Sequence, residues 1–346
     1  MSDPETRAAL AALYLRVFGV EPEEIVPIRS DGSNRKILRL RSGGRSVVGV
    51  RGGNRAENDA FIGFSRHFRS VGLPVPEIIA EDAGEGLYLE TDLGDETLHR
   101  RLLAVRREGR FPGGILPIYE ETVRALVRFQ IDGHRGLDYG LCHQGGEFGA
   151  AAMRRDIDYF REHFLGLLYR GPLDGKALDR DFDRLVAELD GEDRDYFLYR
   201  DFQARNVMIL DDRPWFIDYQ SGRRGPLAYD LASLLYSARA DLGEEVRARL
   251  TETYLEELAG RIPVDRERFL RLFPGFVLIR ILQALGAYGN LGIRQEKTRF
   301  LDSVPFAIAN LRALLARDGP LARPGALRDL VSRITEDPDA VRVPER

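Results

Sequence analysis

The sequence predicts an α+β protein with two lobes: a small N-terminal lobe built on an antiparallel β-sheet with one helix, and a larger, mostly α C-terminal lobe. Strand-like segments gather before about residue 92, and helical periods dominate after about residue 98. The chain has 346 residues and 44% hydrophobic content, which is enough to fill two modest cores. We therefore expect one lobe over residues 1–92 and the other over residues 93–346.

The N-terminal lobe is predicted to start with a short covering helix over residues 6–18, where apolar residues recur at helical spacing. A longer amphipathic helix is expected over residues 56–71, because the pattern stops before Gly72 and Pro74. Strand-like segments lie at residues 25–28, 37–40, 46–51 and 87–90. Together these elements make a small sheet with one helix packed beside it.

The C-terminal lobe is predicted to be helical around one β-hairpin. Helical periods cover residues 115–131, 150–169, 176–190, 228–240, 244–260, 266–288 and 303–317. A strand pair near Asp201 and Asp218 interrupts them, with residues 211–214 as its turn. A hairpin inside a helical lobe would present its loops to the cleft between the lobes. Residues 132–149 contain six glycines and are expected to form a flexible loop beside that cleft.

Charge and composition exclude several classes of function. The formal net charge is −4 and the isoelectric point is near 5.9, so the chain has no basic field for nucleic acid. It has no basic, apolar signal segment, and its longest apolar runs fall short of the roughly 20 residues that cross a bilayer. We expect a soluble, cytoplasmic protein without nucleic-acid or membrane partners.

Metal chemistry based on sulfur or imidazole is also disfavoured by the composition. The single cysteine, Cys142, cannot form an internal disulfide, and the five histidines are scattered without the spacing of a zinc site. Any metal ion would therefore be held by oxygen atoms.

Residues 198–218 carry most of the functional information, because Asp201, Asn206 and Asp218 each border a short β-type segment. Their spacing is typical of kinases. Asp201 is the candidate catalytic residue, which orients an acceptor hydroxyl and accepts its proton. Asn206 and Asp218 are the candidate metal ligands, since amide and carboxylate oxygens bind magnesium. Turn and strand-end roles explain each residue alone, but the joint spacing favours phosphoryl transfer.

Residues 198–236 resemble the aminoglycoside phosphotransferase family, whose members share a two-lobed protein-kinase-like fold, and the likeness extends over nearly the whole chain. Within that family, residues 148–160 and 225–235 are most similar to the bacterial N-acetylmuramate/N-acetylglucosamine anomeric kinases of cell-wall recycling. The resemblance implies ATP and Mg²⁺ as cofactors and a small-molecule hydroxyl acceptor.

The resemblance also implies roles for two residues near the motif. Asp230, in Tyr229-Asp230-Leu231, is expected to open a helix and to accept hydrogen bonds from the backbone of the Arg200-Asp201 loop. It would then be a structural support, which agrees with the preference of carboxylates for helix N-termini. Tyr199 stands where protein kinases have a histidine and is expected to pack beneath the loop.

Nucleotide contacts are predicted in the N-terminal lobe. Strand alternation puts Gly49 and Arg51 on one face, the face on which kinases present a small residue and a lysine to ATP. Arg51 is therefore the candidate phosphate ligand, with Glu57 at the start of the next helix as its ion-pair partner. A solvated strand-end charge for Arg51 and a helix-stabilising first-turn carboxylate for Glu57 are open alternatives.

Two more segments are candidate cofactor contacts. The loop over residues 30–35 contains Ser33, whose hydroxyl could join backbone N–H groups in holding phosphate, although a plain hairpin turn explains the loop equally well. The lobe connector follows the strand at residues 87–90. We expect adenine to hydrogen-bond to the backbone there, near Glu90 and Asp92.

Acceptor contacts are predicted from polar residues around the cleft mouth, namely Gln203, Arg205, Gln220 and Arg223. Arg223 and its neighbour Arg224 suit an anionic substituent, although a solvated turn is the commoner role of such a pair.

Two predicted helices bear on the same region. Asp156 and Asp158 lie two residues apart, so one of them should face solvent. The helix over residues 276–288 is most simply core, and a pocket role for Arg280 or Gln283 is the lesser alternative.

The leading hypothesis is an ATP- and Mg²⁺-dependent kinase that phosphorylates an amino sugar, N-acetylmuramate or N-acetylglucosamine, at the anomeric hydroxyl. The arginines near the motif suit such an acceptor better than a polycationic aminoglycoside. Asp218 and Asp230 are too close in sequence for a protein-kinase activation segment. The alternatives are an aminoglycoside, choline or homoserine-type kinase, and a nucleotide-binding pseudokinase regulator in which Arg51 blocks ATP. We expect a monomer or weak dimer.

Overall fold

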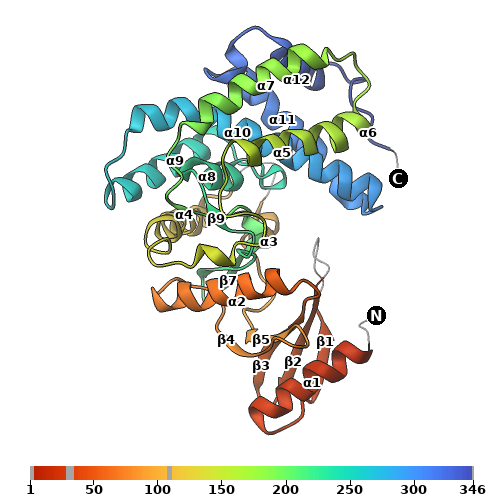
Figure 1. The fold of residues 1–346 in the computed structure, drawn as a ribbon, viewed down its shortest axis with the longest axis vertical. Helices are drawn as coiled ribbons and strands as arrows, with labels where there is room; N and C mark the ends of the chain where they lie inside the picture. The colour runs from red at the N-terminus through yellow and green to blue at the C-terminus, as the bar shows by residue number, and fades with distance from the viewer. Residues whose placement is uncertain (1–3, 29–34, 107–110, 345–346) are drawn as a thin grey trace.

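The architecture has two parts, as the sequence predicts (Figure 1). The computed structural model describes residues 4–28, 35–106 and 111–344. A five-stranded sheet with helices α1 and α2 lies at one end of the molecule, and a larger helical body forms the other end. The predicted fold class is therefore confirmed, whereas the lobe boundary at residue 92 stays a prediction.

The sheet is antiparallel throughout, with strand order β1-β2-β3-β5-β4. Four of its strands match predicted segments, but β4 is missing from the prediction. This edge strand is only partly buried along its length, so its sequence lacks the alternation that marks a half-buried strand. The strands are β1 (Glu24–Pro27), β2 (Lys36–Ser42), β3 (Arg45–Arg51), β4 (Ile78–Asp82) and β5 (Leu87–Thr91).

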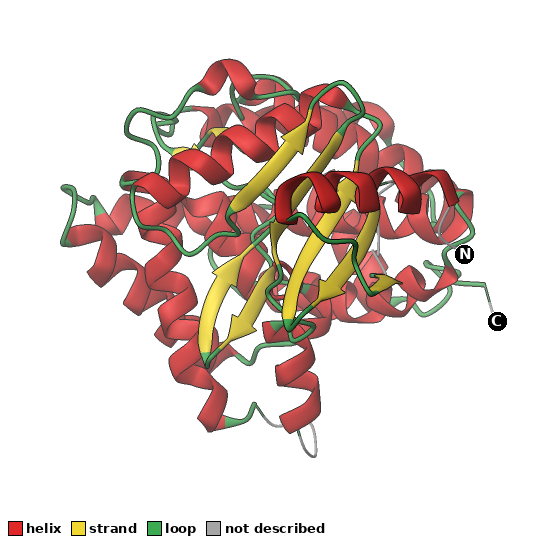
Figure 2. Cartoon of the chain, turned by 90° about the horizontal axis from the view of Figure 1, so that it is seen from below, coloured by secondary structure: helices red, strands yellow, loops and turns green. Residues whose placement is uncertain are grey.

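The two faces of the sheet contact different partners. Leu38 and Leu40 pack against α1 (Pro4–Phe18), which lies across that face (Figure 2). Val50, on the opposite face, joins α2 (Arg55–Ser70) in a core that continues into the helical body. Because α2 shares that core, it joins the sheet to the helical body. The face that a strand residue occupies therefore decides whether its side chain can approach the helical body.

The helical body contains every helix predicted for the C-terminal lobe, together with α3 and α12. The pattern for α12 was readable, because Leu327, Leu330, Val331 and Ile334 are buried at helical spacing. Its helices are α3 (Leu98–Val105), α4 (Leu116–Ile131), α5 (Ala150–Phe160), α6 (Gly166–Leu168), α7 (Gly175–Asp190), α8 (Leu227–Leu235), α9 (Glu244–Ala259), α10 (Arg266–Gly289), α11 (Val304–Leu315) and α12 (Ala326–Glu336).

Helix α10 runs through the centre of the helical body and contacts α5, α8 and α11. With the turns that follow it, the segment Arg266–Arg294 is long and apolar enough to cross a membrane by length and composition, which the expected lengths of the apolar runs did not anticipate. In this structure 72% of its most apolar stretch is buried. It is the core helix of the helical body, and it also carries Arg280 toward the catalytic loop.

Candidate active site

A short β-hairpin inside the helical body carries the predicted catalytic motif. β7 (Val207–Leu210) pairs with β8 (Arg213–Phe216), as the sequence predicts. Asp211 and Asp212 join the strands with φ angles of 51° and 59°. A type I′ hairpin turn requires left-handed backbone at both of these positions, and Asp is among the residues that tolerate it.

The catalytic loop, residues 199–206, is held by a carboxylate from α8. Asp230 accepts hydrogen bonds from the backbone N–H groups of Tyr199 (2.7 Å) and Arg200 (2.9 Å), so the predicted contact is present. Arg200 has a φ of 79°, which is unfavourable for a residue with a side chain. Burial raises the pKa of Asp230 to about 7, although the two backbone N–H groups act against this rise.

The side chain of Arg200 anchors the loop a second time. Its guanidinium donates to both carboxylate oxygens of Asp156 (2.8 and 2.6 Å) and to the hydroxyl of Tyr229. It also lies 5.0 Å from the ring centre of Phe148. Asp156 is buried whereas Asp158 is exposed, so the prediction that one of the two faces solvent is confirmed. Removing one partner of such a buried pair costs about 3–5 kcal/mol.

Tyr199 packs beneath the loop as expected. Its side chain is fully buried, and its hydroxyl donates to the carbonyl of Ile217 at 2.6 Å. The ring meets Phe129, Phe202 and Tyr219 edge to face, with ring centres 5.1–5.9 Å apart. The loop therefore rests on an aromatic base and not on a hydrogen-bonded histidine.

Asp201, Asn206 and Asp218 converge at one end of the hairpin. The Asn206 amide donates to the carbonyl oxygen of Asp201 (2.8 Å) and to the carboxylate of Asp218 (3.2 Å). Asp218 has a φ of 71°, a second strained residue in this loop system. Burial, and next the carboxylate of Asp201, raise the pKa of Asp218. A buried carboxylate whose pKa is raised by burial and by a neighbouring carboxylate marks a site suited to a cation.

The donor set fits magnesium. Among the described residues, no group of three or more His, Cys, Asp or Glu side chains could hold a metal ion, so a cage made entirely of such side chains does not exist there. Asp218 and Asn206 instead offer a carboxylate and an amide oxygen side by side. Mg²⁺ commonly binds to one or two protein oxygen ligands and takes its remaining ligands from phosphates and water.

The predicted pairing of Arg51 with Glu57 is wrong. Arg51 forms ion pairs with Glu5 of α1 (2.9 Å) and Glu85 (3.7 Å). Its neighbour Gly49 points the same way, because a Cβ atom there would meet Leu40 at 2.7 Å. Both residues therefore lie on the α1 side of the sheet. The alternation was read correctly, but it was assigned to the wrong face.

Arg35 reaches the position that the sequence analysis gave to Arg51. Arg35 is the residue that precedes β2, and its guanidinium lies 3.2 Å from Glu57 and 3.3 Å from Asp218. It also donates to the hydroxyl of Tyr88 at 3.3 Å. Lys36 pairs with Arg51 in the sheet register, so those two share the α1 side and Arg35 points to the other side. The alternation of successive strand residues between the two faces was the signal available in the sequence.

Glu90 and Asp92 lie at the connector between sheet and helical body. The Asp92 carboxylate accepts from Arg39 (2.7 and 2.9 Å) and Ser46 (2.5 Å). These hydrogen bonds outweigh the effect of burial and lower its pKa, so its side chain is a structural anchor and only its backbone is available to a base. One carboxylate oxygen of Glu90 is buried without a hydrogen-bond partner among the described residues. Ser33, also predicted here, lies outside the described residues.

The predicted acceptor residues divide into two groups. Gln203 lies 3.5 Å from Asp201 and accepts two hydrogen bonds from Arg205 (2.9 and 2.6 Å), so this pair borders the catalytic carboxylate. Gln220 instead donates to Asp218 (2.8 Å) and to Glu57 (3.3 Å). Its contacts therefore lie on the side of the predicted metal and nucleotide residues.

Arg223 does not form the solvated turn that was the alternative to acceptor binding. It is 4% exposed and donates to the carbonyl of Ser221 and to the carbonyl and side chain of Gln144. These contacts brace the glycine-rich loop over residues 132–149. None of the hydrogen bonds described for Arg223 supports the predicted acceptor role.

A pocket role for Arg280 was the lesser alternative in the sequence, yet Arg280 lies beside Asp201, the predicted catalytic residue. It projects from the buried helix α10, and its guanidinium lies 3.6 Å from the Asp201 carboxylate. An Arg within an apolar helical pattern was the available signal, because burying a charge is costly unless it serves a partner.

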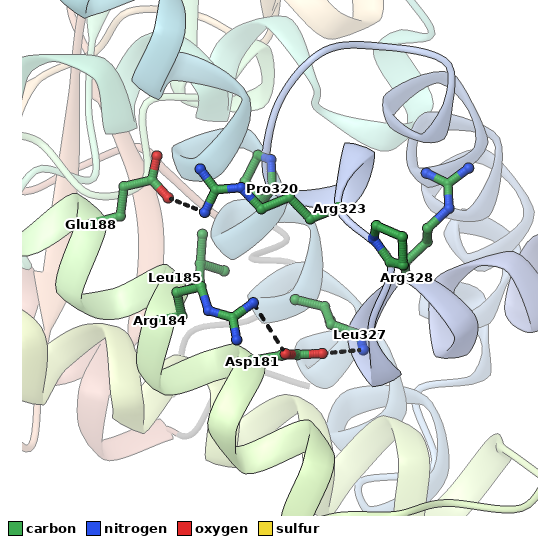
Figure 3. Close-up of a pocket in the computed structure, with 9 residues that line it drawn as sticks. Asp181, Arg184, Leu185, Glu188, Pro320, Arg323, Leu327 and Arg328 are labelled. Atoms are coloured by element: carbon green, nitrogen blue, oxygen red, sulfur yellow. Dashed lines mark hydrogen bonds and ion pairs between the residues drawn. The ribbon is translucent and has the colours of Figure 1, made fainter.

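One pocket in the helical body lies away from these residues (Figure 3). It is lined by residues of α7, α12 and the segment before α12. Asp181 there accepts a hydrogen bond from the backbone N–H of Leu327 (3.1 Å) and lies 3.7 Å from Arg184. These contacts cap α12 and join it to α7, which explains the polar residues without any ligand.

Comparison with known proteins identifies the family of the chain. A family model described as "Phosphotransferase enzyme family" matches residues 24–267. An N-acetylmuramate/N-acetylglucosamine kinase from Pseudomonas aeruginosa is 29% identical over 316 residues, which cover 89% of this chain and 88% of that protein. A protein of the same name from Neisseria meningitidis is 28% identical over 254 residues, which cover 72% of each chain.

Solved structures share the fold at low sequence identity. A spectinomycin phosphotransferase, solved with ADP and spectinomycin, has a TM-score of 0.59 and 14% identity, with 89% of this chain and 99% of that one covered. A choline kinase from Streptococcus pneumoniae has a TM-score of 0.57 and 12% identity, with 88% and 99% covered. These likenesses establish the protein-kinase-like fold.

Proposed function

The chain belongs to the phosphotransferase enzyme family, and from this premise we propose that it phosphorylates an amino sugar of the N-acetylmuramate/N-acetylglucosamine type at the anomeric hydroxyl. It is an enzyme that moves a phosphoryl group from ATP to a hydroxyl of a small molecule. The observation that carries the proposal is the convergence of Asp201, Asn206 and Asp218 beside two arginines, Arg205 and Arg280.

Asp201 is the proposed catalytic residue. Its carboxylate would accept a hydrogen bond from the acceptor hydroxyl and take the proton as the bond to phosphorus forms. Asn206 holds the backbone of Asp201 in place through its amide. Asp230 and Asp156 fix the preceding residue, Arg200, from two sides. Because the transition state of phosphoryl transfer is loose, such positioning matters more than strong basicity.

Asn206 and Asp218 are the proposed magnesium ligands, and bound Mg²⁺ would neutralise charge on the phosphates of ATP. Arg35, held by Glu57, is the proposed phosphate-binding cation in place of Arg51. Its contact with Asp218 supports this proposal, because a guanidinium beside the proposed metal ligand could also reach the phosphates of ATP. The pseudokinase alternative required Arg51 in the nucleotide site, and the pairing of Arg51 with Glu5 removes that argument.

The charges around Asp201 favour a neutral or acidic acceptor. Arg280 lies 3.6 Å from its carboxylate, and Arg205 contacts its neighbour Gln203. A polycationic aminoglycoside would meet like charge at these positions, which costs affinity. A small sugar bearing uncharged or anionic substituents would find donors there instead. The names of the relatives from Pseudomonas aeruginosa and Neisseria meningitidis support the same acceptor class.

The direct test measures ADP release from Mg-ATP with N-acetylglucosamine, N-acetylmuramate, glucose, choline and kanamycin, beside Asp201→Asn. We expect turnover on the N-acetylated sugars that Asp201→Asn abolishes, and a product whose phosphorus NMR signal correlates with the anomeric proton. Preferred turnover of choline or kanamycin would refute the acceptor class. ATP binding without acceptor-stimulated ADP release across the panel would favour a regulatory protein.

A further inference from the structure

Arg280 is a buried cation beside the proposed catalytic carboxylate. The residue is 7% exposed, although it lies on the core helix α10. Its Nε donates to the hydroxyl of Ser233 at 2.9 Å, and one terminal nitrogen donates to the Gln283 side chain. Its other terminal nitrogen lies 3.6 Å from Asp201. Burying an arginine is costly unless its charge and its N–H groups find partners.

The contacts of Arg280 leave one part of its guanidinium unused. Ser233 and Gln283 are neutral, so among the described residues Asp201 supplies the carboxylate of its only ion pair within 4.0 Å. That separation exceeds hydrogen-bonding distance, and the same terminal nitrogen has no hydrogen bond among those residues. Ser233 and Gln283 orient the guanidinium, so that the unused N–H groups are fixed next to Asp201. This arrangement suits a ligand oxygen that arrives beside the reacting hydroxyl.

The chemistry of the acceptor limits which of its oxygen atoms Arg280 could contact. On a 2-acetamido sugar, the substituent next to the anomeric hydroxyl is the N-acetyl group, which both proposed acceptors carry. The lactyl carboxylate of N-acetylmuramate sits on a carbon farther from the reacting centre. Arg280 lies only 3.6 Å from the Asp201 carboxylate, which would hold the reacting hydroxyl. Its guanidinium should therefore be nearer to the acetamido group that both sugars share than to the lactyl carboxylate of N-acetylmuramate.

We propose that Arg280 binds the acetamido carbonyl oxygen of the acceptor and thereby selects 2-acetamido sugars over plain hexoses. This inference rests on the proposed function and adds the group that reads the acceptor. A contact between Arg280 and the acetamido group explains how one site could accept sugars with and without a carboxylate, because both kinds of sugar carry that group. It also disfavours a free 2-amino group, because an ammonium there would face Arg280.

The test compares Arg280→Met and Arg280→Lys with the unchanged enzyme on N-acetylglucosamine, N-acetylmuramate and glucose. A hydrogen bond from a charged donor is worth about 10- to 100-fold in kcat/KM. We expect Arg280→Met to lower the ratio of kcat/KM on each N-acetylated sugar to kcat/KM on glucose by about this factor. Arg280→Lys, which keeps a cation, should recover part of the loss. Calorimetric affinities for the same sugars should follow the same order.

Arg247→Met is the matched control. Arg247 is equally buried and donates to the carbonyl of Leu235 and to the side chain of Asn310, so its loss also removes a buried guanidinium. The melting temperature of Arg247→Met shows how much stability is lost when a buried guanidinium is removed away from the site. The preference of this variant among the three sugars should match that of the unchanged enzyme.

Three outcomes would overturn the inference. A loss confined to N-acetylmuramate would assign Arg280 to the carboxylate. An equal loss on all three sugars, or a higher KM for ATP, would assign it to holding Asp201 or the phosphates. Unchanged discrimination in a folded variant would remove it from the acceptor site. The proposed function fails separately, if the unchanged enzyme does not phosphorylate the N-acetylated sugars.

Discussion

The catalytic loop and strand β3 both carried predicted site residues, but the structure contains the predicted contacts of Asp230 and Tyr199 with the loop and overturns the predicted pairing of Arg51 on the strand. The contacts of Asp230 and Tyr199 were expected from the family resemblance, and they join residues that are 31 and 18 positions apart in the sequence. The role of Arg51 depended on which face of β3 meets the active site, and that face is decided by the packing of α1 and α2. The family resemblance predicted these loop contacts, whereas alternation along β3 could not decide which face of the strand meets α2.

The largest effect is expected in the loop, from Asp201→Asn. This change keeps the size of the side chain and removes the proton acceptor, so kcat should fall by about 10²–10⁴-fold. The melting temperature should fall only modestly, because Asp201 is partly exposed, accepts no close hydrogen bond from the described residues, and lies 3.6 Å from its ion-pair partner Arg280. Steady-state ADP release and thermal unfolding measure the two effects. A fall in kcat of less than tenfold would deprive the loop of its proposed catalytic residue.

Asp230→Asn probes the support of the same loop. Asparagine has an NH2 group in place of one carboxylate oxygen of aspartate. This hydrogen-bond donor would face the backbone N–H of Tyr199 or Arg200. Losing one of two buried hydrogen bonds should lower the free energy of unfolding by about 1–3 kcal/mol. The value of kcat should also fall, because the loop loses its anchor. Denaturant unfolding and ADP release test this, and full activity in a destabilised variant would limit Asp230 to a folding role.

The extent to which sequence predicted the structure follows the same division. Helical spacing predicted α2 and α10 because their apolar faces meet the core directly. The hairpin was predictable from its turn, since Asp211 and Asp212 supply the left-handed backbone. Strand β4 was not predictable, because an edge strand with partly buried residues carries little alternation.

Arginine-rich positions were the hardest to assign. Arg223 and Arg51 look like ligand-binding cations in a linear sequence, yet their partners are Gln144 and Glu5, which are distant along the chain. Arg35 and Arg280 looked less prominent, and they approach Asp218 and Asp201. A long, flexible cation can reach several partners, so its assignment requires the three-dimensional arrangement.

Arg35→Gln and Arg51→Gln test the corrected face of the sheet as a pair. Both changes remove one guanidinium from the same small sheet. Arg35→Gln should raise the KM for ATP and the calorimetric dissociation constant of ATP by about tenfold or more, because a charged contact to phosphate is lost. Arg51→Gln should change both by less than about twofold, since Arg51 pairs with Glu5 and Glu85. The reverse order would restore the original prediction for Arg51.

The smallest effect is expected from Glu90→Gln. This change tests which residues lie on the α2 side of the sheet through the stability of the protein alone, without any ligand. Val48 pairs with Glu90 across β3 and β5, so Glu90 should share the buried side with α2. Desolvation there raises the pKa of Glu90 to about 8, whereas an unfolded chain has a glutamate pKa of about 4.3. Between these values the folded protein holds a proton that the unfolded chain releases, so Glu90 makes folding less favourable as the pH rises.

Glutamine does not titrate, so the stability of Glu90→Gln relative to the unchanged protein should increase between about pH 4 and pH 8 and then level off. After allowance for solvent screening, the increase should be about 1–2 kcal/mol. Denaturant unfolding at several pH values measures it, with Glu77→Gln as a control at an exposed carboxylate. A flat difference would place Glu90 in solvent, and the face assigned to Arg35 would then lose its independent support.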